Sequence, residues 1–444
     1  SRSKKMNLAV VGFGTMGQYD AQALSPKVET VYICSGKPGE QIEKICEEKG
    51  ITNYRIPESE EQSLRDSQLV HLCVPTDSVS DTMERVLPYC KKGTVVSDQT
   101  SRKEPVVKAF NRYTRSNPNA GIYLVPIHTL CDPSKLPNPV IDAMGFIFGI
   151  IQCVPEDHKK EYMQAYETAL ELYSHMSGHI SEFRDWREHD AIIANTQINT
   201  SRTNLAIASA FANAKCFPGL NETYSGAFDV MKFALAMRAA SQPPHVYKGI
   251  QLGGKYGRDL VKHASSVENQ LWSLVENGSE NEYRQRVLRA KSILFKDLTD
   301  PILTDHDLKQ FGDISVRLPN SDLSIVQWAV SLAERGRNIF QDRKGTTPMY
   351  DALLALAARL FNTDSLERAI SAPFENPRLL IEDLEFHEQL QRWSEQIIFD
   401  NPAGYDRLHT AMRDNLKEKT LREQVEKSKQ VVGVCRRRVC DLLG

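Results

Sequence analysis

The chain has 444 residues, of which 41% are hydrophobic and 25% are charged. This composition is ordinary for a soluble globular protein, and the length predicts two or three domains. The formal net charge of −2, from 55 basic and 57 acidic residues, gives no electrostatic reason to expect binding to nucleic acid or to a membrane surface. Since no uninterrupted apolar stretch approaches the roughly 20 residues of a membrane-spanning helix, we expect no such helix.

The cysteines and the N-terminus favour a cytoplasmic location. The nine cysteines are scattered, Cys435 and Cys440 are the closest pair, and there is no C-x-x-C motif. This pattern favours reduced, buried thiols over disulfides or zinc ligands, so we expect no metal site. The first five residues are partly basic but lack the apolar core of a signal peptide.

A strand-like apolar run leads straight into a glycine-rich turn at the start of the chain. Gly12, Gly14 and Gly17 have the spacing G-x-G-x-x-G. The first glycine would allow a tight turn, the second the approach of a pyrophosphate, and the third close packing of the next helix. The phosphates would lie at the positive end of that helix, although a purely structural turn is the alternative. To this predicted dinucleotide site we also assign Phe13, Thr15, Met16, Val74 and Pro75.

Strand-like and helix-like segments alternate through the first part of the chain. The predicted strands are 8–12, 30–34, 69–74, 94–97, 122–126 and 145–153, with a last edge strand at 178–183. Helical patterns lie between and after them, at 40–49, 78–87 and 155–174. This alternation predicts an α/β Rossmann domain, with a doubly wound, mostly parallel sheet, over residues 1–183.

Helical periodicity dominates after Arg184. The predicted helices are 188–215, 228–239, 257–277, 280–295, 323–334, 348–361 and 384–398. Residues 184–444 therefore read as a separate all-helical domain that contributes to substrate binding. Because its long apolar helices need a partner, we also expect a homodimer through this domain.

The residues after the second predicted strand indicate which dinucleotide would bind. An enzyme specific for NAD carries an acidic residue there, which holds the ribose 2′-hydroxyl. Here the strand ends at Cys34 and is followed by Ser35, Gly36 and Lys37. A hydroxyl and an ammonium would hold a 2′-phosphate, so we predict NADP with Ser35 and Lys37 as contacts. The alternative is a polar turn with Glu40 reaching back to the ribose.

His128 is the candidate general base for removing a hydride from an alcohol. Histidine has an unperturbed pKa of about 6.5 and accepts protons near neutral pH. His128 follows the predicted strand 122–126, at the sheet edge where ligands of parallel sheets bind. A structural histidine is the alternative at that position, and His71, inside a strand pattern, is expected in the core.

A second candidate cluster, Asp98-Gln99-Thr100-Ser101-Arg102-Lys103, follows another predicted strand. Its hydroxyls and cation could meet a carboxylated substrate, which would make Ser101 and Lys103 site residues. The alternative is that Ser101 caps the helix that begins near Glu104.

Together these motifs resemble the prephenate dehydrogenases, in particular the fungal-type, monofunctional, NADP-dependent enzymes of tyrosine biosynthesis. The glycine turn, the D-x-x-S-x-K-like run at 98–103 and Ile127-His128 carry the resemblance. It continues in order with Glu188-His189-Asp190, Asn195-Thr196-Gln197, Arg238, the run 318–324 and the run 381–386. The match covers nearly the whole chain, and the ordered combination is far more specific than any single motif.

The resemblance implies oxidative decarboxylation of prephenate to 4-hydroxyphenylpyruvate. His128 would accept the proton of the C4 hydroxyl while hydride leaves C4, and Ser101 would hydrogen-bond His128 or that hydroxyl. Arg238 would pair with a substrate carboxylate, and Gln197 would line the pocket. His189 and Asp190 are interpreted as a pair that anchors the start of the helical domain.

The chain departs from the family pattern at two places. His128 is followed by Thr129-Leu130-Cys131, where the family commonly has proline, a small apolar residue and glycine. Ser201 stands where many members have a second pocket histidine, with Arg202 beside it. A hydroxyl offers no cation to a carboxylate, so Ser201 is where a preference for prephenate or arogenate would be decided. An arogenate dehydrogenase, or a sensor that binds NADP(H) without turnover, are the alternatives.

Overall fold

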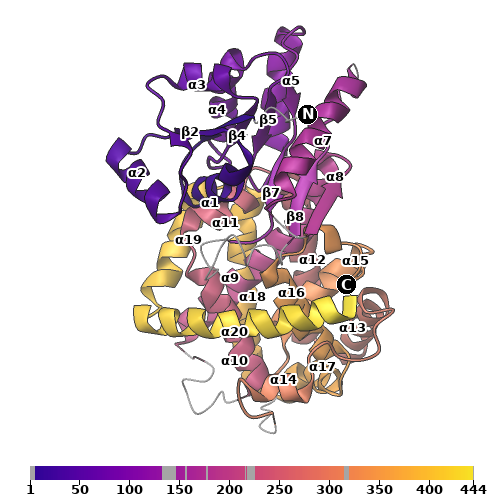
Figure 1. Cartoon of the computed structure of the whole chain (residues 1–444). Coiled ribbons are helices and arrows are strands. Elements are labelled where there is room, and N and C mark those ends of the chain that lie inside the picture. The colour runs from indigo at the N-terminus through magenta and orange to yellow at the C-terminus, as the bar shows by residue number, and fades with distance from the viewer. Residues whose placement is uncertain are drawn as a thin grey trace. The chain divides into compact units, whose positions relative to one another are not determined.

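A computed structural model describes residues 6–132, 147–155, 158–176, 179–215, 217, 226–314 and 320–443. The chain divides into two compact units, Ser1–Ile193 and Ala194–Gly444 (Figure 1). The division falls after the helix at 186–193, whereas the sequence placed it near Arg184. Gly145, Gly178, Leu318 and Pro319, which belong to predicted strands or motifs, lie outside the described residues.

The first unit contains a six-stranded, wholly parallel sheet with strand order β3-β2-β1-β4-β5-β6. Its strands are β1 (Asn7–Val11), β2 (Thr30–Cys34), β3 (Tyr54–Arg55), β4 (Leu69–Leu72), β5 (Val95–Asp98) and β6 (Tyr123–Leu124). The predicted Rossmann-type sheet is confirmed, and only the two-residue β3 was not predicted. The order reverses between β1 and β4, which is where such sheets bind ligands.

Helices cover both faces of this sheet because alternate strand residues point to opposite sides. Leu8 and Val10 pack in one apolar cluster with residues of α1, α2 and α7, whereas Ala9 and Val11 pack in another with residues of α3, α4 and α5. The helical elements of this unit are α1 (Thr15–Leu24), η1 (Ser25–Lys27), α2 (Gly39–Glu48), α3 (Glu60–Asp66), α4 (Val79–Val86), η2 (Leu87–Tyr89), α5 (Glu104–Ser116), α7 (Lys159–Tyr173) and α8 (Trp186–Ile193).

The last strands of the first unit form a separate three-stranded sheet, β7-β8-β9. It consists of β7 (Ile127–Thr129), β8 (Ile147–Ile151) and β9 (His179–Phe183). β7 runs antiparallel to β8, and β8 runs parallel to β9. The strands predicted near 145–153 and 178–183 therefore exist, but the expectation that they extend the parallel sheet is wrong. His128 lies within β7 rather than at the end of β6.

All regular elements in the described part of the second unit are helices, apart from a single bridge between Gly226 and Asp313. Its elements are η5 (Ala194–Ile198), α9 (Asn199–Ala214), α10 (Ala227–Ala240), α11 (Pro244–Gln251), α12 (Lys255–Glu276), α13 (Glu280–Leu294), α14 (Asp305–Lys309), α15 (Leu323–Glu334), η6 (Arg343–Gly345), α16 (Pro348–Phe361), α17 (Ser365–Glu375), α18 (Pro377–Ile398), α19 (Pro402–Asp414) and α20 (Glu418–Leu443). The predicted all-helical domain is thus confirmed.

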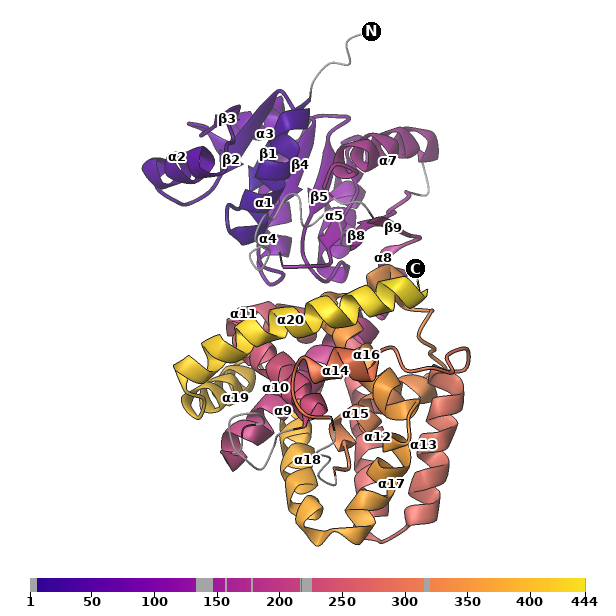
Figure 2. The same cartoon turned by 60° about the horizontal axis from the view of Figure 1, so that its bottom comes forward.

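Segments far apart in the sequence build the core of the helical unit. The long C-terminal helix α20 packs against α10 and α16, and α18 lies beside α9 and α12 (Figure 2). Trp328 of α15 and Trp393 of α18 are among the buried side chains of this core. None of the described helices is both long enough and apolar enough to cross a membrane.

The segment η5 is a π-helix, a form that often marks functional positions. It contains Asn195, Thr196 and Gln197 of the family motif, and it packs against α12. A Cβ on Gly257 of α12 would lie 2.5 Å from Cδ1 of Ile198, the end of a side chain that would have to move to make room.

Candidate active site

The glycine-rich turn joins β1 to α1 and has the geometry that its spacing predicts. Gly12 has a φ of +96°, and a Cβ there would lie 2.4 Å from the carbonyl oxygen of Cys73. A Cβ on Gly17 would lie 2.1 Å from the carbonyl oxygen of Gly12. A Cβ on Gly14 would meet none of the described atoms within 4 Å. The first and third glycines are therefore required by packing, and the second leaves the backbone open to a ligand.

The N-terminus of α1 is suited to hold an anion. Gly14 is the residue that precedes the helix, no described side chain caps it, and the first turn carries no acidic residue. Its N–H groups therefore present partial positive charge next to exposed Gly14 and Thr15. The side chain of Phe13 is 2% exposed and packs in the core, so only its backbone could contact a cofactor.

The other predicted cofactor residues follow β2 and β4. Val74 lies beside the turn, since its Cγ1 would be 3.2 Å from a Cβ on Gly12, and Pro75 is exposed. Ser35 is half-buried and its Oγ accepts a hydrogen bond of 3.3 Å from the backbone N–H of Lys37. Glu40 is exposed in the first turn of α2. This geometry leaves both the Ser35–Lys37 and the Glu40 interpretations open.

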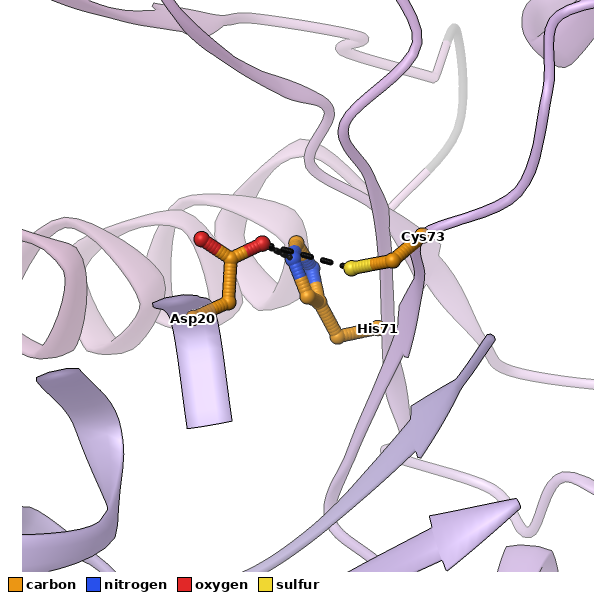
Figure 3. Close-up of side chains that lie close together, drawn as sticks. All are labelled: Asp20, His71 and Cys73. Atoms are coloured by element: carbon orange, nitrogen blue, oxygen red, sulfur yellow. Dashed lines mark hydrogen bonds and ion pairs between the residues drawn. The ribbon is translucent and has the colours of Figure 1, made fainter. Parts of the chain in front are cut away.

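Asp20, His71 and Cys73 belong to a polar network (Figure 3) that lies beside the glycine turn, since a Cβ on Gly12 or Gly17 would contact Cys73. Oδ2 of Asp20, on α1, is 2.8 Å from Nε2 of His71 and accepts a hydrogen bond of 3.2 Å from the thiol of Cys73. The hydroxyl of Tyr173, on α7, lies 3.0 Å from Nδ1 of His71. The potential metal-ligand atoms of Asp20, His71 and Cys73 lie within 4.8 Å of one another. Because their hydrogen bonds are mutually satisfied, we interpret the cluster as structural.

Gln99 extends this network to the strand that carries His128. Its Nε2 donates to Oδ1 of Asp20 over 3.0 Å and to Oγ1 of Thr129 over 2.7 Å. Its Oε1 accepts from the backbone N–H of Thr129 over 3.0 Å. One buried side chain therefore links helix α1 with β7. The sequence showed Gln99 only as part of the 98–103 run, and its role depends on contacts between distant residues.

His128 is buried and is held by a second histidine. Its Nδ1 lies 3.0 Å from Nε2 of His189, which is on α8, and the ring centroids are 5.2 Å apart. Nδ1 of His189 lies 2.8 Å from Oδ1 of Asp190. Among the described residues, no hydrogen bond reaches Nε2 of His128. The structure thus brings together the predicted base and a pair that the sequence interpreted as a structural anchor.

Asp190 also caps helix α5. Its Oδ1 accepts from the backbone N–H of Lys103 over 2.9 Å, and its Oδ2 accepts from that of Glu104 over 3.0 Å. Lys103 is the residue before α5 and makes no side-chain cap. The alternative in which Ser101 caps this helix is therefore wrong. A carboxylate from α8 performs that function, 86 residues away in sequence from Glu104.

Ser101 is half-buried in the loop before α5. The described contacts include no hydrogen bond between Ser101 and His128, whose Nδ1 is bonded to His189 instead. A contact of Ser101 with a substrate hydroxyl stays a prediction.

Lys103 is fully buried and its ammonium is saturated. Its Nζ donates to Oδ2 of Asp98 over 3.0 Å, to the carbonyl oxygen of Asp98 over 3.3 Å and to that of Ile127 over 2.6 Å. An ammonium has three donors, so these acceptors leave none for a substrate carboxylate. The predicted role of Lys103 in substrate binding is corrected accordingly: it fixes β7, next to His128, against the end of β5.

The surroundings of both histidines favour their neutral forms. Burial, together with the neighbouring His189 and Lys103, lowers the pKa of His128 well below its usual value. Burial also lowers the pKa of His189, although the hydrogen bond and charge of Asp190 oppose that effect. A neutral His128 can accept a proton at physiological pH.

In the helical unit the structure places Gln197 and Ser201 one turn apart. The hydroxyl of Ser201 donates to the carbonyl oxygen of Gln197 over 2.6 Å and accepts from Nε2 of Gln251 over 2.7 Å. Gln251, on α11, is 1% exposed and was not singled out from the sequence. Ser201 is therefore already engaged by protein groups on both sides, and no motif signalled this partner.

The two arginines of the helical unit differ in burial. Arg202 is fully buried, and its guanidinium donates to Ser394, Asn199 and Gln327 over 3.0 to 3.4 Å. Burial lowers the pKa of Arg202 to about 10. Arg202 is thus part of the core, with its guanidinium bonded to protein side chains. Arg238 lies half-buried near the end of α10, where a substrate contact stays a prediction.

A Rossmann-type sheet with this turn, followed by a helical unit, defines the class of dinucleotide-binding proteins with a helical C-terminal domain. Residues 199–436 match a family described as a "6-phosphogluconate dehydrogenase C-terminal domain". Residues 7–118 match "NAD binding domain of 6-phosphogluconate dehydrogenase". The chain belongs to the first of these families, because that match covers more than half of the chain.

Individual relatives agree with this assignment. The chain is 24% identical over 408 residues to "Prephenate dehydrogenase (NADP+)" of Saccharomyces cerevisiae, covering 89% of this chain and 86% of the relative. It is 26% identical over 403 residues to "Probable prephenate dehydrogenase (NADP+)" of Schizosaccharomyces pombe, covering 87% and 88%. The resemblance indicated by the motifs is thereby confirmed.

Solved structures are similar at lower identity. Prephenate dehydrogenase from A. aeolicus, in complex with hydroxyphenyl propionate and NAD+, is 17% identical with a TM-score of 0.46, covering 64% of this chain and 96% of that one. Synechocystis arogenate dehydrogenase is 16% identical with a TM-score of 0.43, covering 63% and 95%.

Proposed function

We propose that this chain is an NADP-dependent prephenate dehydrogenase that converts prephenate to 4-hydroxyphenylpyruvate and CO2. The observation that carries the proposal is His128: a buried, neutral imidazole with Nε2 unoccupied by the described residues, in a unit that also holds the glycine turn. The names of the fungal relatives, which span nearly the whole chain, support the same reaction and cofactor.

The turn fits a dinucleotide because Gly14 is open and the N-terminus of α1 is uncapped by described side chains. Gly12 to Gly17 would hold the pyrophosphate, and Ser35 with Lys37 would hold the 2′-phosphate. When bound, NADP+ supplies the acceptor for the hydride that leaves ring C4.

His128 performs the proton step in this mechanism. As carbonyl character develops at C4, Nε2 of His128 accepts the hydroxyl proton, and the electrons released by loss of the ring carboxylate as CO2 aromatise the ring. The product keeps its hydroxyl, so His128 returns the proton to the phenolate oxygen. Arg238 and Gln197 would orient the substrate, and Ser101 would hydrogen-bond the hydroxyl.

The test is to follow NADPH absorbance with prephenate, with arogenate and without substrate. We expect absorbance to grow with prephenate. Growth with arogenate alone would show the aminated substrate to be the natural one, in which case the contacts around Ser201 set the preference. No growth with either substrate, despite NADP binding confirmed by calorimetry, would refute an enzymatic function and favour a sensor.

His128→Asn gives the matched control for this assay. The variant should lose turnover by a factor on the order of 100 or more, because general base catalysis contributes about that much. It should bind NADP with nearly unchanged affinity, because the base acts only in the chemical step. Equal losses in binding and turnover would argue for a structural histidine.

We also propose that the chain forms a homodimer through its helical unit and works in the cytoplasm. Ile381 near the start of α18 and Phe399 just after its end expose 72% and 77% of their surface, and both are available for contact with a second copy. Every cysteine in the described part of the chain is a free thiol, which suits a reducing compartment. Sedimentation equilibrium of the protein and of Ile381→Lys tests the dimer, and a monomeric wild type would refute it.

A further inference from the structure

The hydrogen bonds around His128 determine where its proton lies. Asp190 accepts from the backbone N–H groups of Lys103 and Glu104, and a backbone N–H can only donate. The carboxylate of Asp190 is therefore an acceptor, and the nitrogen 2.8 Å away, Nδ1 of His189, carries the proton between them. In the neutral imidazole this leaves Nε2 of His189 with a lone pair.

The same reasoning fixes the position of the proton on His128. Nε2 of His189 lies 3.0 Å from Nδ1 of His128, so Nδ1 must carry the hydrogen of that bond. Neutral His128 then has its lone pair on Nε2. Four residues determine which nitrogen is protonated, and all of them belong to the first unit: Lys103, Glu104, His189 and Asp190. His189 is fully buried.

We propose that Asp190 and His189 are positioning residues that hold His128 as its Nδ1–H tautomer, so that Nε2 is the nitrogen that accepts the substrate proton. The inference rests on the proposed function for its catalytic consequence. The tautomer itself is a property of the protein alone. The backbone N–H groups at the start of α5 thereby determine the tautomer of His128, through the side chains of Asp190 and His189 on α8.

Asp190→Asn is the decisive variant because it should move the proton of His189, and with it the proton of His128, to the other ring nitrogen. The amide oxygen would take the Oδ2 position, because there it can accept from the N–H of Glu104 over 3.0 Å and from that of Lys103 over 3.2 Å. The opposite orientation would leave the N–H of Glu104 facing a donor. The amide nitrogen would then donate to Nδ1 of His189, and Nε2 of His189 would donate to Nδ1 of His128. His128 would carry its proton on Nε2, and the base would be lost.

The experiment is ¹⁵N NMR of the protein with labelled histidine, with signals assigned by their loss in His128→Gln and His71→Gln. In the wild type we expect His128 to be protonated on Nδ1. His71 is an internal reference, since its Nε2 faces Asp20 and its Nδ1 accepts from Tyr173, so it should show the opposite tautomer. In Asp190→Asn, His128 should change tautomer while His71 does not.

Turnover supplies the second readout. Asp190→Asn should lower kcat by a factor on the order of 100 or more, as does the loss of the correct imidazole tautomer in other enzymes, with NADP affinity little changed. His189→Gln, whose side-chain oxygen can still accept from Nδ1 of His128, should keep a larger share of kcat than His189→Leu.

A wild-type His128 protonated on Nε2 would overturn the inference, and so would an unchanged tautomer and kcat in Asp190→Asn. If Asp190→Asn does not fold, the wild-type spectrum and the comparison of the two His189 variants decide the matter. Full turnover in His128→Asn would refute the role of His128 as the base, and a wild type without turnover would refute the proposed function. Either result would leave the NMR result standing.

Discussion

The carbonyl oxygen of Gly12 lies 2.1 Å from the position that a Cβ on Gly17 would occupy. The start of α1 is thus pressed against the turn that precedes it, and only a residue without a side chain allows this. Gly14, between the two, is open to its surroundings. The fold therefore requires a glycine at positions 12 and 17. At position 14 a glycine is required only if a ligand approaches the backbone there.

Gly17→Ala and Gly14→Ala should accordingly behave differently. Gly17→Ala should lower the free energy of unfolding by about 2 kcal/mol or more, because the neighbouring backbone cannot move away cheaply. Gly14→Ala should change it by less than about 0.5 kcal/mol and yet weaken NADP binding, since the new methyl group occupies the path of the pyrophosphate. Chemical denaturation and calorimetric titration measure the two quantities. A Gly14→Ala variant that binds NADP normally would contradict the assigned site.

Lys37→Ala tests the choice of cofactor. Loss of a charge-assisted contact to the 2′-phosphate should weaken NADP binding by about 10- to 100-fold and leave NAD binding nearly unchanged. Glu40→Gln is the matched control on the same segment, because a carboxylate that held the ribose would make this variant lose NAD affinity. An unchanged ratio of NADP to NAD affinity in Lys37→Ala would refute the phosphate contact.

The pH dependence of kcat should reflect the lowered pKa of His128. The neutral ring is the active form, so activity should be complete above the pKa of His128 and fall as the pH decreases through it. Because burial, His189 and Lys103 lower that pKa well below 6.5, the acidic limb of the profile should lie well below pH 6.5. The charged groups Asp98 and Asp190 lie in the same cluster, and each is paired with other protein groups. An acidic limb at or above pH 6.5 would contradict this assignment.

The close approach of α12 to the π-helical segment can be tested by a pair of compensating changes. Gly257→Ala should cost up to about 2 kcal/mol of stability, because its new methyl group would displace Cδ1 of Ile198 and the better helix propensity of alanine offsets only about 1 kcal/mol. Ile198→Val removes that carbon and alone should cost about 0.5–1.5 kcal/mol. The double variant should be more stable than the sum of the two losses predicts. Strict additivity in thermal or chemical denaturation would show that the two residues do not interact.

Local sequence patterns predicted the elements of the fold well but not how distant strands pair. The glycine turn and the apolar runs around β1, β2, β4 and β5 indicated a parallel sheet, and it is confirmed. Nothing in the run near 147–151 distinguishes a strand of that sheet from one of a second sheet, because both need short apolar segments. The antiparallel pairing of β7 with β8, which sets Ile127 opposite Ile150, joins two segments that no local pattern links.

In the candidate site, too, the sequence indicated single residues but not the contacts between distant side chains. His128 was recognisable because it follows a predicted strand, and its role as the base is still a prediction. Its bond to His189 joins residues 61 apart, which no spacing rule foresees. The sequence suggested that Lys103 binds a substrate carboxylate. It could not show that Asp98 and Ile127 already accept the three hydrogen bonds of this ammonium.

Gln99 has a consequence for the motions of the protein. Because one amide holds both Asp20 of α1 and Thr129 of β7, neither element can separate from the other without exposing a broken pair of buried hydrogen bonds. The cofactor turn and the strand of the base should therefore open as a single cooperative unit in hydrogen exchange. Thermal fluctuations that would carry the base away from the turn are thereby suppressed before any ligand arrives.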